Sequence, residues 1–416
     1  NRSPTKKTKK IMTINFKISC LSLILLTCQL VQADDWLQFR GNHHQGLALD
    51  SSPPTNISAE KNIAWKTALP GRGLSSPIVI GNRVFLTAAS TVDQTRLHVI
   101  CLDSSNGKVL WNREFWATGR TVCHEKTCVA APSPASDGKY IYALYSSNDL
   151  LCLDIDGNLK WLRGLMQDYP NASNSLGLAS SPIIVDNTLI VQIENDSDSF
   201  VAGIDLKNGS NLWKFPRTKK ANWSTPIRIN EEDIAIQGSE GLTCVKAKTG
   251  KIQWAYGEGA STIPSSVTSK DDSVVYVPSN GITALKPRKD NNTPEIIWQE
   301  AQLRPGTSSP IIINDNIYII NRAGVLNAAN KATGERLWRL RLEGPFSGSP
   351  VASKTHMYIA SERKGLLQEI NLQGKEGTIS GTIELGETIL GTPAIANDSI
   401  YVRSDGHLWK ISNPEG

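Results

Sequence analysis

One unit recurs along most of this chain and constrains its fold more than any other feature. Each copy opens with a Ser-Pro or Thr-Pro step. Two short β-type runs follow, separated by a tight polar turn, and then a third and usually a fourth run. The steps are Ser76-Pro77, Ser133-Pro134, Ser181-Pro182, Thr225-Pro226, Ser309-Pro310, Ser349-Pro350 and Thr392-Pro393, and an eighth copy, Ser265-Ser266, lacks the proline. Copies lie roughly 40–57 residues apart, so the repeat predicts an all-β, eight-bladed β-propeller of four-stranded blades.

The first copy shows how one blade is expected to form. Ile78-Val79-Ile80 predicts strand A, the proline before it being tolerated where a strand begins. Strands C and D are joined by Asn106-Gly107, a favoured hairpin turn, and strand D reaches Trp111. A tryptophan recurs at this position, so we expect it to be a wedge between blades. The strand D tryptophans are Trp65, Trp111, Trp161, Trp213, Trp254, Trp298 and Trp338.

The two ends of the repeat array do not match each other. The last copy has strands A, B and C at 394–411 and then stops, whereas the strand containing Trp65 has no A, B or C before it. We therefore expect this N-terminal strand to complete the last blade, because ring closure removes an exposed sheet edge. The resulting division is a leader at 1–33, an N-terminal extension at 34–60, the propeller at 61–412 and a tail at 413–416.

The leader has the composition of a signal peptide. Five lysines precede an apolar stretch at 18–30 that is too short for an ordinary membrane span, and small residues end at Ala33. We expect cleavage near Ala33 and export to the periplasm or beyond the cell, and residues 1–11 to be upstream sequence. Cys28 is a poor match to a lipid-modification site. No later stretch predicts an integral membrane segment.

The charge of the chain argues against nucleic acid as a partner. The chain has 44 basic and 39 acidic residues, and six of the basic ones lie in the leader. The exported chain would therefore be close to neutral, and no nucleic-acid-binding surface is predicted. We expect a monomer.

The stretch from Cys101 to Trp111 resembles the tryptophan-docking repeat, A-x-D-x-x-T-G-K-x-x-W, of pyrroloquinoline-quinone propellers. Weaker copies run from Gly203 to Trp213, Cys244 to Trp254 and Ala328 to Trp338. Two branches share this repeat. One contains the quinoprotein alcohol dehydrogenases, and the other contains the propeller lipoprotein of the outer-membrane barrel-assembly machinery and its secreted relatives. The resemblance implies the propeller fold along residues 36–411.

The residues that the dehydrogenase branch requires are not found in this sequence. That family's pattern includes adjacent cysteines over the quinone, and this chain has no Cys-Cys pair. Its calcium ligands and aspartate base match no motif here. We therefore predict no cofactor and no metal, and a protein without catalytic residues.

Departures from the repeat are where we expect function. The N-terminal segment 36–60 carries Arg40, His43 and His44, and the long connection at 117–131 carries Arg120, His124 and Lys126. Asn174 lies in the connection at 166–179, and Glu194 and Asp196 lie in the B-to-C loop of blade 3. In a meander, D-to-A and B-to-C connections share one face, so we predict that the cations face an acidic wall there. The alternative is that these are inert surface loops.

Five cysteines follow the leader. Cys101, Cys152 and Cys244 recur at one repeat position, where a small buried side chain is expected. Cys123 and Cys128 are close in sequence, and export favours a disulfide between them. With His124 they provide too few ligands for zinc, and their order is wrong for a c-type haem.

The sequence thus favours an exported, non-catalytic binding or scaffold module of the cell envelope. Its partner would be a protein or small ligand on the face that carries the D-to-A loops. The alternative is a quinone- or metal-dependent oxidoreductase of the quinoprotein dehydrogenase type.

Overall fold

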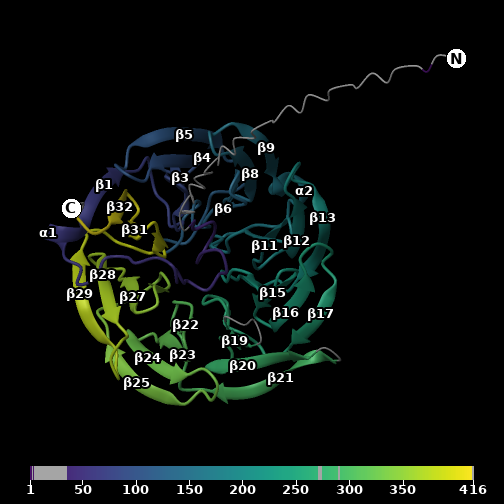
Figure 1. Cartoon of the computed structure of the whole chain (residues 1–416). Coiled ribbons are helices and arrows are strands. Elements are labelled where there is room, and N and C mark those ends of the chain that lie inside the picture. The colour runs from purple at the N-terminus through teal and green to yellow at the C-terminus, as the bar shows by residue number, and fades with distance from the viewer. Residues whose placement is uncertain (2, 4–34, 270–273, 289–290, 415–416) are drawn as a thin grey trace. The chain divides into compact units, whose positions relative to one another are not determined.

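The computed structural model describes residues 1, 3, 35–269, 274–288 and 291–414. Apart from residues 1 and 3, the predicted leader lies outside the described residues, as do its cleavage site near Ala33 and Cys28. Within residues 33–416, the described strands form eight four-stranded antiparallel sheets arranged in a ring (Figure 1). This arrangement confirms the predicted eight-bladed propeller.

Each of the first four blades is a simple meander from the innermost strand A to the outermost strand D. Blade 1 consists of β2 (Ile78–Ile80), β3 (Arg83–Ser90), β4 (Arg96–Asp103) and β5 (Val109–Trp116). Blade 2 consists of β6 (Ala135–Ser136), β7 (Tyr140–Leu144), β8 (Asp149–Asp154) and β9 (Leu159–Gly164). Blade 3 consists of β10 (Ile183–Val185), β11 (Thr188–Ile193), β12 (Ser199–Asp205) and β13 (Asn211–Arg217). Blade 4 consists of β14 (Ile227–Arg228), β15 (Asp233–Gly238), β16 (Gly241–Lys246) and β17 (Ile252–Tyr256).

Blades 5 to 7 repeat the meander. Blade 5 consists of β18 (Val267–Thr268), β19 (Val275–Val277), β20 (Ile282–Arg288) and β21 (Asn291–Glu300). Blade 6 consists of β22 (Ile311–Ile313), β23 (Asn316–Ile320), β24 (Val325–Asn330) and β25 (Arg336–Arg341). Blade 7 consists of β26 (Val351–Ala352), β27 (His356–Ala360), β28 (Leu366–Asn371) and β29 (Thr378–Glu384). Two single-turn helices, α1 (Ala59–Asn62) and α2 (Leu165–Asp168), lie in connections.

Blade 8 closes the ring with strands from both ends of the propeller. It contains β30 (Ala394–Ala396), β31 (Ser399–Arg403) and β32 (His407–Ile411), and its fourth strand is β1 (Ile63–Ala68). Lys66 pairs with Trp409 in an antiparallel register. Figure 1 shows the purple β1 beside the yellow β32. The predicted closure by the N-terminal strand is confirmed.

The tryptophans join neighbouring blades, as predicted. Trp111 Nε1 donates a hydrogen bond to the carbonyl of Ile155 in blade 2, at 3.1 Å. Gly157 packs on the same ring with φ +83°, and a Cβ there would lie 2.9 Å from Trp111 Cδ2. The Gly of the repeat therefore gives the preceding Trp room to dock. The same Nε1 bond to the next blade is made by Trp65, Trp161, Trp213 and Trp298.

The repeated cysteine position faces this tryptophan within its own blade. Cys101 pairs in register with Trp111, Cys152 with Trp161 and Cys244 with Trp254. All three cysteines are buried, which agrees with their interpretation as small core residues. No helix in the described part of the chain is long and apolar enough to cross a membrane.

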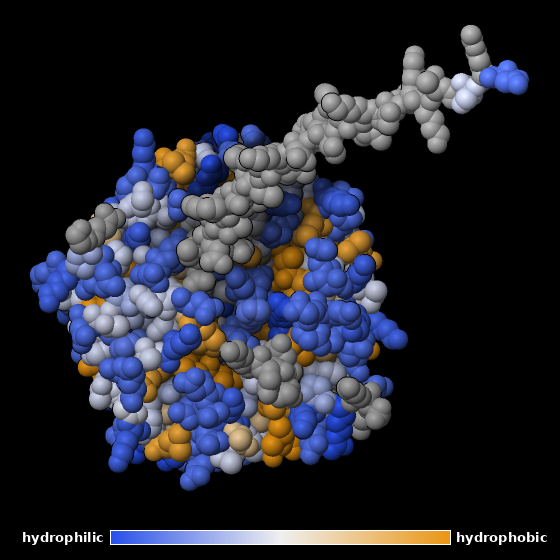
Figure 2. Space-filling view, viewed as in Figure 1, coloured by the Kyte–Doolittle hydropathy of each residue, from blue (hydrophilic) through white to orange (hydrophobic). Residues whose placement is uncertain are grey.

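Residues 35–57, here called the plug segment, lie against the propeller and cross the middle of the ring (Figure 1). They bond to strand A, its leading proline or the A-to-B turn of every blade. Trp36 exchanges two backbone hydrogen bonds of 2.9 Å with Val79 in blade 1. The partners in blades 2 to 8 are, in order, Ser136, Ile184, Arg228, Thr268, Pro310, Ala352 and Asp398. The plug segment therefore ties all eight blades together at the end of strand A. Figure 2, in the same view as Figure 1, shows mostly hydrophilic side chains with separate hydrophobic groups between them.

Candidate functional site

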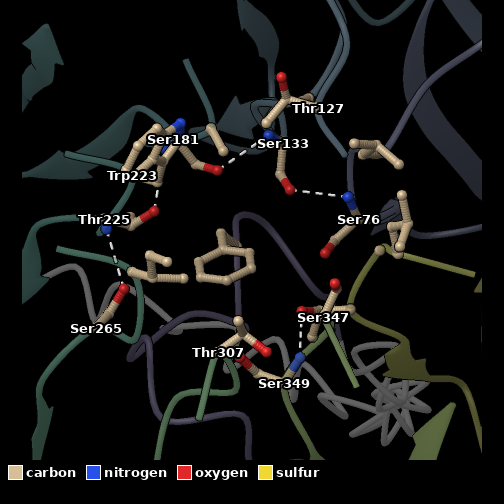
Figure 3. A pocket seen from close by; sticks show the side chains of 18 of the residues that line it. Ser76, Thr127, Ser133, Ser181, Trp223, Thr225, Ser265, Thr307, Ser347 and Ser349 are labelled. Atoms are coloured by element: carbon tan, nitrogen blue, oxygen red, sulfur yellow. Dashed lines mark hydrogen bonds between the residues drawn. The ribbon is translucent and has the colours of Figure 1, made fainter. Parts of the chain in front are cut away.

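The Ser or Thr that precedes each strand A lines the central channel. These eight residues, here called the hydroxyl belt, are buried. Along the ring, the backbone N–H of each donates to the hydroxyl of the next, as Ser133 N does to Ser181 Oγ at 3.0 Å (Figure 3). Seven such bonds of 2.8–3.0 Å link the residues in order. The belt consists of Ser76, Ser133, Ser181, Thr225, Ser265, Ser309, Ser349 and Thr392.

The belt is open between blades 8 and 1. Ser76 Oγ is buried and has no hydrogen-bond partner among the described residues. This junction is bridged instead by Arg403 of β31, which is 2% exposed and donates from Nη1 to the Thr87 carbonyl of β3 at 2.6 Å. Burial lowers the pKa of Arg403 to about 10. The ring is therefore joined differently where its two chain ends meet.

The belt forms the wall of a central bowl of about 370 Å³. Phe39 of the plug segment lines it, and apolar side chains from the D-to-A connections surround it. Trp223, one of these, is anchored by donating from Nε1 to the Gly177 carbonyl at 2.9 Å. The remaining apolar side chains of this lining include Leu74, Leu176, Ile263 and Leu390. The bowl can therefore accept an apolar group on the face that carries the D-to-A loops.

His124 and Lys126 contribute to this bowl, as residues of the predicted binding face. Both are exposed, and His124 Nδ1 accepts the backbone N–H of Lys126 at 3.1 Å. Lys126 Nζ lies 3.6 Å from the Glu362 carboxylate of blade 7. Their loop, which follows blade 1, thus reaches a loop of blade 7.

The other predicted residues of these loops do not line the bowl. Exposed Arg120 donates to Ser173 Oγ at 3.2 Å, and buried Asn174 donates to the Ser146 carbonyl at 2.9 Å. Glu194 pairs with Arg217 at 2.5 Å and is 5% exposed, and its burial raises its pKa. Exposed Asp196 accepts the backbone N–H of Ala221 at 3.1 Å.

Among the described residues, Arg120, His124 and Lys126 form no ion pair with the carboxylates of the predicted acidic wall. Its carboxylates are used by their own neighbours: Glu194 by Arg217, and Asp198 by Lys219 at 2.9 Å. Lys126 finds its acidic partner in blade 7, which the closed ring places two blades away from blade 1.

Arg40, His43 and His44 belong to the plug segment. Arg40 is 1% exposed and donates to the Pro310 carbonyl, and burial lowers its pKa to about 9. His44 is also buried, and its pKa falls to about 3 because burial disfavours its charge. His43 is exposed and lies 3.5 Å from Arg228 of blade 4. Arg40 and His44 therefore act within the packing of the plug, and neither lines the bowl.

Cys123 and Cys128 are both free thiols in the structure, so the predicted disulfide is not formed in it. Cys128 is fully buried in the core between blades 1 and 2, and burial raises its pKa to about 12. Cys123 is partly exposed and accepts a contact from Gln94 Nε2 at 3.6 Å. The two thiols thus occupy different environments.

The bowl does not fit a quinone with its divalent cation. Among the described residues, its lining contains no carboxylate to ligate a cation or act as a base, and the titratable side chains there are His124 and Lys126. In the described part of the chain, no group of three or more His, Cys, Asp or Glu side chains is placed to hold a metal. The hydroxyls of the belt are committed to neighbouring backbone N–H groups, except that of Ser76.

Sequence reasoning located the residues of the belt but not their role. The Ser-Pro and Thr-Pro steps predict the start of strand A, and they do not by themselves predict hydrogen bonds between blades. One feature of the sequence does indicate that role: the eighth copy keeps a serine, Ser265, at the belt position although it lacks the proline. A hydroxyl that is retained where the proline is lost indicates that the hydroxyl has its own structural partner. Trp223 was missed because it lies outside strand D.

The solved structures most similar to this propeller include proteins of two functional kinds. BamB from Moraxella catarrhalis superposes with a TM-score of 0.60 at 15% identity, covering 85% of this chain and 99% of that one. Quinohemoprotein alcohol dehydrogenase from Comamonas testosteroni gives 0.68 at 11% identity, covering 92% and 82%. At these identities the likeness shows the fold.

Sequence relatives also include both kinds. Outer membrane protein assembly factor BamB of Legionella pneumophila is 24% identical over 49% of this chain and 54% of its own length. BamB of Moranella endobia is 22% identical over 65% and 66%. The quinoprotein alcohol dehydrogenase PedH of Pseudomonas putida is 24% identical over 60% and 41%. The chain thus aligns with less than two thirds of each relative.

The family match covers far more of the chain than these pairwise alignments. The family described as outer membrane protein assembly factor BamB matches residues 55–256, 278–379 and 322–416. These ranges include strands of all eight blades and most of the tryptophan-docking positions. With its eight-bladed ring and docked tryptophans, this chain belongs to the outer membrane protein assembly factor BamB family.

Proposed function

We propose that this protein is an exported, non-catalytic scaffold that binds part of another envelope protein during outer membrane protein assembly. The observation that carries the proposal is the central bowl, with its apolar rim on the D-to-A face. Two rim side chains, Leu176 and Ile263, remain 39% and 44% exposed. Apolar side chains left exposed around a concave surface are typical of a binding site for another molecule.

The names of the relatives support the same role. Two of them are named outer membrane protein assembly factor BamB, and a similar solved structure is also a BamB. We infer export from the signal-peptide composition of the leader at 1–33. Localisation in the cell envelope is part of the same proposal. The partner is expected on the D-to-A face because the plug segment occupies the region where the strands A end.

Site-specific photo-crosslinking tests this proposal. Benzoyl-phenylalanine would replace Leu176 or Ile263 in the exported protein, with Leu212 and Leu337 as matched controls on outer strands. The controls have similar exposure, 48% and 49%. After irradiation of whole cells, discrete adducts with envelope proteins should form from the bowl positions. Equal adducts from the outer-strand positions, or adducts from those alone, would remove the support for the bowl.

The alternative is a quinone-dependent oxidoreductase, which the similarity to PedH and to a quinohemoprotein dehydrogenase favours. The lining of the bowl argues against it, because the described residues that form this lining include no carboxylate. Thermal denaturation with pyrroloquinoline quinone and calcium separates the two. We expect no rise in the melting temperature, whereas a saturable rise at micromolar quinone would favour the enzyme, because ligand binding stabilises by mass action.

A further inference from the structure

A second hollow adjoins the central bowl on the same face. This side groove, of about 670 Å³, shares Lys126, Ile263 and Thr307 with the bowl. Its other walls are the connection between β21 and β22, the loop between β23 and β24, and the connection between β25 and β26. Its size is in the range of ordinary ligand sites. A ligand can thus extend from the bowl over blades 5 to 7.

The side groove carries an excess of positive charge. Arg304 and Arg322 are exposed in its lining, and neither has an ion pair or hydrogen bond to a described residue. The carboxylate in the lining, Glu362, is already engaged: it lies 3.6 Å from Lys126 Nζ and accepts from Ser347 Oγ at 2.6 Å. Glu258 shares a third hollow with Arg304 but forms no ion pair with it. The two guanidinium groups are therefore available to an external anion.

The groove is also partly apolar. Ile263, Ile320 and Phe346 line it, together with Pro305 and Pro345. A free inorganic anion would leave this apolar lining uncovered. A polypeptide that alternates acidic and apolar side chains matches both the arginines and the apolar lining. Its carboxylates would bind the guanidinium groups through paired hydrogen bonds, and its apolar side chains would cover the apolar lining.

We propose that the side groove binds an acidic, extended segment of a partner polypeptide. Carboxylates of the segment lie on Arg304 and Arg322, and a neighbouring apolar side chain enters the central bowl. This inference rests on the proposed function and adds to it the chemistry of the partner.

Binding of a defined peptide tests the inference. The probe is a fluorescein-labelled peptide that alternates leucine with glutamate, and its counterpart has lysine in place of glutamate. Fluorescence anisotropy with the full exported chain at low salt should show binding of the glutamate peptide and much weaker binding of the lysine peptide. Arg304→Glu and Arg322→Glu should each weaken binding by roughly fivefold, since an exposed ion pair contributes up to about that factor.

Matched controls are available in blade 6. Arg339 and Arg341 of β25 are exposed, form no side-chain hydrogen bond or ion pair with another described residue, and lie outside the lining of the bowl and groove. Arg339→Glu and Arg341→Glu make the same change of net charge and should leave affinity within twofold. Thermal melts of all four variants should match the wild type, because these side chains are exposed.

Three results would overturn the inference. They are unchanged affinity in both groove variants, no binding of the glutamate peptide to the wild type, or displacement by phosphate well beyond that by chloride of equal ionic strength. The last result would assign the groove to phosphate. Crosslinks from Leu176 and Ile263 that persist in the groove variants would leave the scaffold function standing, so the two failures are distinguishable.

Discussion

Replacing Ser181 with alanine should destabilise the propeller, whereas the same replacement of Ser76 should not. Ser181 Oγ accepts the backbone N–H of Ser133 at 3.0 Å, and all of these groups are buried. Removal of the hydroxyl leaves this N–H without a partner, which costs about 1–3 kcal/mol of unfolding free energy. Ser76 Oγ has no partner in the described structure, so its loss removes an unsatisfied buried hydroxyl. We expect Ser76→Ala to change stability by about 0.5 kcal/mol or less, or to stabilise.

The comparison is closely matched. Both serines occupy the same repeat position, precede a proline and are at most 2% exposed. Both variants lose the same atom and leave the same small cavity. The difference between their unfolding free energies therefore isolates one link of the hydroxyl belt. Ser309→Ala, which removes the acceptor of the Ser265 N–H at 2.9 Å, should behave like Ser181→Ala.

Equilibrium unfolding in urea, followed by tryptophan fluorescence, measures the effect. The tryptophans lie between blades, so their emission reports on disassembly of the ring. The midpoint should fall for Ser181→Ala and Ser309→Ala at an unchanged dependence on urea. Equal losses for Ser76→Ala and Ser181→Ala would show that the belt hydrogen bonds do not contribute to stability.

Three further predictions concern the plug, the ring closure and the cysteines. His44→Asn should flatten the pH dependence of stability. The wild-type His44 has a pKa of about 3 in the fold and about 6.5 when unfolded. The contribution of neutral His44 to the free energy of unfolding is therefore complete above pH 6.5 and is lost as the pH falls. At pH 5 the free energy of unfolding should be lower by about 2 kcal/mol for this reason. Urea unfolding at pH 7 and pH 5 tests this, and parallel losses in both proteins would contradict it. Deletion of residues 34–69 removes β1 and the plug segment, so aggregation should follow, and light scattering that stays at the wild-type value would show another closure. Cys128→Ser should lower the free energy of unfolding by about 1–3 kcal/mol, because it buries a hydroxyl, and Cys123→Ser should lower it much less. Equal decreases for the two variants in urea unfolding would indicate that the two cysteines form a disulfide.

The blades of this protein are encoded locally. Short β-type runs separated by tight polar turns specify strands and hairpins between residues a few positions apart, so their order along the chain was enough to predict eight blades. The docking of Trp111 was predictable for the same reason, because Gly157 and Trp111 belong to one repeating spacing. Ring closure followed from the surplus strand at one end and the missing strand at the other.

The binding face was decided by tertiary structure. Lys126 meets Glu362, and Arg304 and Arg322 converge on one groove, only because the closed ring brings together loops of different blades. These residues lie in connections without any repeat, so no periodic pattern marks them. The plug segment is a similar case: the sequence predicts Arg40 as a candidate binding residue, yet its partner at Pro310 is 270 residues away. Strands and turns depend on neighbours in sequence, whereas the bowl, the groove and the plug depend on contacts that exist only after the ring has closed.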